Sequence, residues 1–234
     1  MSNFFAPASA DGDYFDERLR TNQDTADHDH DDFVSFAEAL MTADDDALPE
    51  ALGRFMDIDY LLRYMAVDFA IGNWDGITTF YCGDEWGCGN HNFYIYKEEE
   101  RPFFWLIPWD LEASFMPESW IEGFVPWDNL DASCEEADDA GSEDHPVRPA
   151  GCDQMIRAIA LADRERYEGY LEEVLEEHFT PEIIEGRMTA LVELISPYIK
   201  ADPDQYYEEW LLTVLWQMDM FEDLRERLRQ EIGR

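Results

Sequence analysis

MDIDYLLRYMAVDFAIGNWDG, residues 56–76, is the stretch around which the rest of the sequence can be organised. Apolar residues recur along it at helical spacing, namely at Ile58, Leu61, Leu62, Met65 and Phe69. The run stays apolar to Ile71 and then reaches Gly72-Asn73, a pair that commonly ends a helix. These residues predict a buried central helix that stops just before Asp75.

The hydrophobic period changes after this helix. NFYIY (92–96) and FFWLIPW (103–109) are rich in aromatic and apolar residues, and the charged segment KEEERP (97–102) between them is typical of a turn. Together these segments predict a β-hairpin.

Helices are predicted on both sides of the central segment. DDFVSFAEAL (31–40) has apolar residues at helical spacing, with Asp31 or Asp32 as its cap. Helical periodicity returns in four later stretches, over residues 154–161, 164–178, 181–198 and 203–232. The order of helices, a hairpin and more helices predicts an α+β fold that is mainly helical.

The charge balance excludes several partners. Lys and Arg number 16 and Asp and Glu number 55, which gives a formal net charge of −39. Nucleic acid binding needs clustered basic residues, so no nucleic acid partner is expected. No run of about 18 apolar residues occurs, so no integral membrane segment is expected. The first residues lack a signal peptide and read like the middle of a domain, which predicts a partial polypeptide.

The four cysteines form two local pairs, Cys82 with Cys88 and Cys134 with Cys152. Each pair brackets a short loop, which favours two disulfides and an oxidising compartment. A zinc site would need closer pairs or nearby histidines, and only His91 and His145 are near. Disulfides are therefore the preferred interpretation, with zinc ligands or unpaired thiols as alternatives.

Three polar residues stand at the ends of the predicted elements. Asp75 follows the central helix, Asn92 opens the first strand of the hairpin, and Asp110 follows the second strand. Their oxygen atoms are the ligands that Mg²⁺ prefers, and phosphoryl transfer uses such a set. Asp and Asn also act as ordinary caps and turn residues, which is the competing interpretation of each.

The segment resembles the CotH kinase family, which is similar in fold to protein kinases. The resemblance rests on the aspartate of GNWDG (72–76), the strand NFYIY (92–96) and the strand end LIPWDLEASF (106–115), within a match over roughly residues 13–200. It implies a kinase-like C-terminal lobe over residues 33–200. Residues 1–32 would then be the remnant of an incomplete N-terminal lobe, and residues 201–234 a C-terminal helix.

The resemblance also implies an activity. It implies transfer of phosphate from ATP, with Mg²⁺ or Mn²⁺, to hydroxyl groups of a protein substrate. Asp75 would be catalytic, and Asn92 and Asp110 would bind metal. Together with the paired cysteines, the resemblance implies an extracellular or cell-surface location. The alternative is a non-catalytic kinase-like protein with a structural or adhesive role on a surface or spore coat.

This sequence departs from the kinase pattern in several places. The asparagine of a kinase catalytic loop lies about five residues after the aspartate, whereas Asn92 lies seventeen residues after Asp75. The difference matches an inserted segment that holds Cys82 and Cys88, and Asn73 or Asn90 is an alternative ligand. Glu112 stands where the family usually has Asp. No GxGxxG loop is present, and the residues that would grip the nucleotide are mostly missing.

Overall fold

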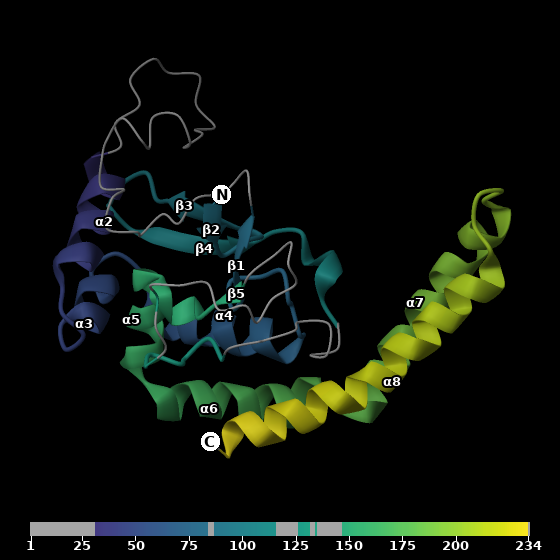
Figure 1. Cartoon of the computed structure of the whole chain (residues 1–234). Coiled ribbons are helices and arrows are strands. Elements are labelled where there is room, and N and C mark those ends of the chain that lie inside the picture. Colours follow the sequence, from purple (N-terminus) through teal and green to yellow (C-terminus); the bar gives the residue numbers. More distant parts are fainter. Residues whose placement is uncertain (1–30, 84–86, 116–125, 132–133, 135–146, 234) are drawn as a thin grey trace.

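The computed structural model describes residues 31–83, 87–115, 126–131, 134 and 147–233 (Figure 1). The fold is α+β and mainly helical, as predicted. Residues 1–30, which make up most of the predicted N-terminal remnant, lie outside the described part. The proposed division into domains stays a prediction.

The central helix is α4, Ile58–Ala70, and it confirms the prediction from the 56–76 stretch. The side chain of Asp57 caps its first turn by accepting a hydrogen bond from the backbone N–H of Tyr60. Gly72 ends the helical run with φ of 58°, a conformation that glycine adopts without steric cost. The helix therefore ends where the polar residues of the loop begin.

Helices α3 (Leu48–Gly53), α5 (Gln154–Ala162) and α6 (Arg164–Glu173) pack against α4, and a π-helical turn, Val174–His178, continues α6. Helix α2 (Asp31–Thr42) packs against α3 and α5. Phe36 of α2 stacks on Phe104 with ring centroids 5.1 Å apart, which joins the helices to the hairpin. The periodicity did not predict α3, because six residues are too few to show a helical repeat.

The predicted hairpin is confirmed as strands β3 (Phe93–Lys97) and β4 (Phe104–Pro108), which pair with Phe93 opposite Pro108. A second antiparallel sheet was not predicted. It has the order β2-β1-β5 and consists of β1 (Phe80–Gly83), β2 (Gly87–Gly89) and β5 (Val147–Arg148). These strands are short and partly made of glycine, so they show no alternating pattern.

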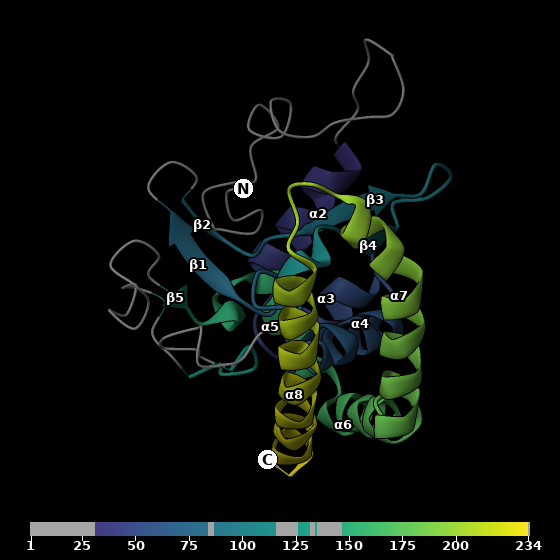
Figure 2. The same ribbon diagram turned by 90° about the vertical axis from the view of Figure 1, so that its right-hand side faces the viewer.

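The last two helices form an antiparallel arm that extends from the compact part of the molecule (Figure 1). They are α7 (Pro181–Ala201) and α8 (Tyr207–Ile232), and Figure 2 shows them beside each other. The helix predicted from Pro203 begins only at Tyr207. The side chain of Asp202 accepts a hydrogen bond from the backbone N–H of Asp204, which holds the connection as a turn.

One of the two predicted disulfides lies within the described residues. Cys134 and Cys152 are joined, and this bond fixes residue 134 beside the start of α5. Cys82 and Cys88 are opposite each other in the β1–β2 ladder, while their side chains lie outside what the structure describes. Among the helices of the described ranges, none combines the length and apolar character needed to cross a bilayer.

Candidate active site

Asp75 and Asn92 meet in space although seventeen residues separate them. The side-chain Nδ2 of Asn92 donates a hydrogen bond of 2.8 Å to Oδ2 of Asp75, and both residues are half-buried. The chain leaves this point along β1 and returns along the antiparallel strand β2, in which Cys88 lies opposite Cys82. The inserted segment therefore leaves its two ends close together, as the sequence predicted.

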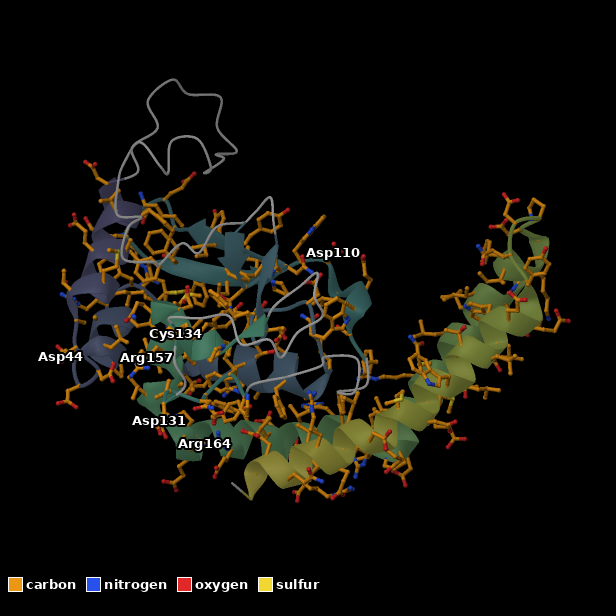
Figure 3. The ribbon with its side chains drawn as sticks, viewed as in Figure 1. Asp44, Asp110, Asp131, Cys134, Arg157 and Arg164 are labelled. Carbon is orange, nitrogen blue, oxygen red and sulfur yellow. A yellow bond between two sulfur atoms is a disulfide. The ribbon has the colours of Figure 1, made fainter. Side chains whose placement is uncertain are left out.

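Asp110 is placed next to this pair by the β3–β4 ladder. The backbone N–H of Trp109 donates to the carbonyl of Asn92 at 2.9 Å, which extends the pairing one step beyond Phe93 and Pro108. Asp110 follows directly, before the 3-10 turn Leu111–Ala113. Its side chain is exposed at the edge of the compact part of the molecule (Figure 3).

Glu112 adds another carboxylate to the group. A hydrogen bond with Asp110 and the negative charge of Asp110 raise the pKa of Glu112, and the charge of Asp75 acts in the same direction. Like charges disfavour ionisation of their neighbours, and the charges of Asp110 and Asp75 both act on Glu112 in this way. A bound cation would relieve that repulsion.

Backbone conformation ties the two loops of the site together. Asn92, Asp110 and Phe115 have φ of 57°, 54° and 61°. Asn and Asp tolerate this left-handed region, but a phenylalanine there is strained. The N–H of Phe115 donates to the carbonyl of Ile71 at 2.6 Å, and the Phe115 ring stacks on Phe179. These contacts hold the segment after Asp110 against the end of α4.

A buried network beneath the site fixes the loop that carries Asp75. Asp68 is only 4% exposed, and its carboxylate accepts hydrogen bonds from Asn73 Nδ2 at 2.9 Å and Thr78 Oγ1 at 3.0 Å. Burial raises the pKa of Asp68 to about 6 against these hydrogen bonds. A Cβ atom added to Gly76 would lie 2.3 Å from Asn73 Nδ2, so the loop can close only around glycine. The sequence pattern did not single out Asp68, although an aspartate inside an apolar helical run is a usable signal.

The structure separates the three asparagines that the sequence left open. Asn73 donates to Asp68, and Asn90 Nδ2 donates to the carbonyl of Ile77. Both side chains are buried and hold the loop. Asn92 alone among the three has a hydrogen bond to Asp75 in the contacts of the described chain. The assignment of metal binding to Asn92 remains a prediction, and this geometry favours it over the other two.

His91 is a further neighbour that the sequence did not assign to the site. Burial lowers the pKa of its imidazole, and the negative charge of Asp75 acts against that shift. The only signal was its position next to Asn92 in the sequence.

Trp109 and Tyr94 form an edge-to-face pair, with centroids 5.5 Å apart, on the exposed side of the hairpin.

The oxygen donors of the site suit a hard divalent cation. Asp75 and Asp110 supply carboxylates, and because Nδ2 of Asn92 faces Asp75, Oδ1 remains the acceptor atom of that amide. In the described ranges, no three His, Cys, Asp or Glu side chains come close enough to form a metal-binding group by themselves. Any metal here would therefore need Asn92 and further ligands, such as phosphate oxygens.

Two arginines of the helical side serve structural ion pairs. Arg157 binds Asp45 through two nitrogen atoms, and Arg164 contacts Asp128, Glu168 and Glu231. Figure 3 shows both arginines well separated from Asp110. These side chains hold α5 and α6 in place and do not reach the carboxylates of the site.

Comparison with known proteins gives two findings. The model of the family described as CotH kinase protein matches residues 2–232. Inner spore coat protein H of Bacillus subtilis (strain 168) is 26% identical over 152 residues, which are 64% of this chain and 34% of that protein. The match thus spans about a third of the length of this relative.

Proposed function

This chain belongs to the CotH kinase family, and from that premise we propose that it is an atypical protein kinase domain. It would transfer the γ-phosphoryl group of ATP to a hydroxyl group of a protein substrate. The observation that carries the proposal is the hydrogen bond between Asn92 and Asp75, formed beside Asp110. A catalytic carboxylate next to an amide and a second carboxylate is the arrangement that kinases use.

Each residue has a proposed role. Asp75 orients the acceptor hydroxyl and accepts its proton as the oxygen attacks phosphorus. The hydrogen bond from Asn92 fixes the orientation of the Asp75 carboxylate. Asn92 and Asp110 would hold Mg²⁺ or Mn²⁺. When bound, the metal supplies positive charge that offsets the charge of the transferring phosphoryl group.

The proposed location is a spore coat or cell surface. The named relative is an inner spore coat protein, and the Cys134–Cys152 disulfide is compatible with an oxidising setting. The strongly negative charge of the chain is compatible with cations and basic protein segments as partners.

The test uses the full chain, radiolabelled ATP and Mn²⁺, with casein and the chain itself as acceptors. We expect Asp75→Asn to lower phosphate transfer at least about 100-fold, because it removes the proton acceptor while preserving shape. Asp110→Asn should lower it similarly, and it also preserves the left-handed backbone at that position. Asp219→Asn on the exposed surface of α8 is the matched control and should keep full activity.

Calorimetry then separates the proposed roles. Asp75→Asn should retain metal-dependent ATP binding, whereas Asp110→Asn should lose it. Transfer at the wild-type rate by both variants would refute the proposal.

A non-catalytic surface protein is the second candidate. The observations that favour it are the name of the relative, which describes a coat protein, and the structural use of Arg157 and Arg164. This candidate predicts no metal-dependent ATP binding by the wild-type chain. The same calorimetric experiment therefore decides between the two candidates.

A further inference from the structure

Helix α7 of the arm carries a stripe of apolar residues that are exposed to solvent. On α7 the stripe consists of Leu191, Leu194, Ile195 and Tyr198, which are 50%, 64%, 37% and 73% exposed. Their spacing of three, four and seven residues places them on one side of the helix. Within the described residues, α7 has no fully buried side chain. A helix with one apolar stripe in solvent is typical of an incomplete bundle.

The second helix of the arm also exposes apolar residues. Leu212 and Leu215 of α8 are 65% and 51% exposed. In contrast, the far half of α8 is anchored in the core by buried residues that include Phe221 and Leu228. The exposed apolar residues are thus confined to the half of α8 that extends with α7 from the compact part (Figure 1).

We propose that this arm is a self-association surface, on which a second copy of the chain packs its own α7 in antiparallel orientation. A two-fold contact requires a patch that is complementary to itself. With the axis between Leu194 and Ile195, each Leu194 faces an Ile195 and each Leu191 faces a Tyr198. Four apolar residues per copy then cover one another, and the two arms together form a four-helix bundle.

Charge complementarity supports this register. The same axis places Arg187, near the base of α7, opposite Asp202, at its tip. Both residues are exposed, and symmetry produces the pair twice. Glu193 falls opposite Ser196, so the nearest acidic side chain of the stripe meets no like charge. The register chosen by the apolar residues therefore also pairs the charges.

The antiparallel orientation also limits the electrostatic repulsion between the two negatively charged copies. Two copies that each carry −39 repel each other when they are close. α7 has 21 residues, which corresponds to a length of about 30 Å. Antiparallel packing places the two acidic bodies at opposite ends of the bundle, well beyond the screening length of about 8 Å at physiological salt. A parallel arrangement would bring both bodies to the same end.

Sedimentation of the full chain, over a concentration range of about 1 to 100 μM, tests the proposal. We expect a dimer that dissociates on dilution. Leu194→Glu should weaken it at least about 100-fold, because two glutamates then enter the apolar centre. Circular dichroism would verify that this exposed substitution leaves the helices intact. A wild-type chain that remains monomeric over the whole range would overturn the proposal.

A charge reversal tests the register itself. Arg187→Glu should weaken the dimer, because two acidic groups then face each other at both symmetric positions. Combining it with Asp202→Arg should restore association by reversing each pair, and circular dichroism of the double variant would verify that the helices joined by the Asp202 turn remain intact. Arg229→Glu makes the same charge change in the last turn of α8, in the half of that helix anchored in the core, and should leave association unchanged. A double variant that associates no better than Arg187→Glu would contradict the antiparallel pairing.

Discussion

Two aspartates on one short stretch of chain have opposite surroundings. Asp68 is buried at the end of α4 and accepts hydrogen bonds from two buried side chains, while Asp75, seven residues later, is half-buried and faces Asn92. The Asp68 carboxylate holds the loop together through its hydrogen bonds to Asn73 and Thr78, and the loop carries Asp75. The loop that carries the proposed catalytic carboxylate of Asp75 is thus held in position by a second carboxylate, Asp68, which is buried.

Gly76 directly follows Asp75, packs against Asn73 and Asp68, and gives the largest expected effect on stability. In Gly76→Ala the new Cβ would lie 2.3 Å from Asn73 Nδ2 and 2.8 Å from Asp68 Oδ1, inside a packed network. We expect the free energy of unfolding to fall by about 3 kcal/mol. Urea denaturation measures the change.

Gly169 provides the matched control for this substitution. It lies in α6 with nothing within 4 Å of its added Cβ. Gly169→Ala should raise stability by up to about 1 kcal/mol, because alanine favours the helix. If Gly76→Ala were equally harmless, the close packing around Asp68 would be disproved.

Thr78 donates a hydrogen bond to the buried Asp68, and Asn92 donates one to the half-buried Asp75. Substituting each donor in turn therefore compares the contributions of the two hydrogen bonds to stability. Thr78→Val keeps the shape but removes a hydrogen bond to a buried carboxylate, at a cost of about 2 kcal/mol at pH 7. Asn92→Gly keeps the left-handed backbone and should cost less than about 1 kcal/mol. Equal decreases in the free energy of unfolding, measured by urea denaturation, would show that the two hydrogen bonds contribute equally to stability.

The pH dependence of stability is a further consequence of the burial of Asp68. The pKa of Asp68 rises from 3.8 to about 6 because the carboxylate is buried. Between these values the folded protein holds a proton that the unfolded chain has released. The contribution of Asp68 to stability is therefore greatest below about pH 4, falls as pH rises to about 6, and is constant above that.

Asp68→Asn isolates this contribution. The difference in unfolding free energy between wild type and Asp68→Asn should decline across the same pH window, measured by urea denaturation at each pH. Asp153, whose pKa burial also raises to about 6, is present in both proteins and cancels from the difference. Curves that stay parallel from pH 4 to 7 would contradict the burial of an ionisable Asp68.

Prediction from sequence succeeded where a pattern was long. The apolar repeat of the 56–76 stretch gave α4 to within a residue or two, and the aromatic segments gave β3 and β4. It failed for α3 and for the β2-β1-β5 sheet, whose elements are too short to show a period. At the site, residue types suggested Asp75, Asn92 and Asp110, but not the supporting role of Asp68.

The sequence by itself determined the helical class, the hairpin, the local Cys134–Cys152 pair and the three polar residues at element ends, because each depends on neighbours within a few residues. Only the tertiary structure decided which asparagine meets Asp75, because Asn73, Asn90 and Asn92 differ in burial and partners rather than in type. It also decided that the apolar stripe of α7 faces solvent. Whether a stripe is core or surface depends on what packs against it, and that contact is made by residues distant in the chain.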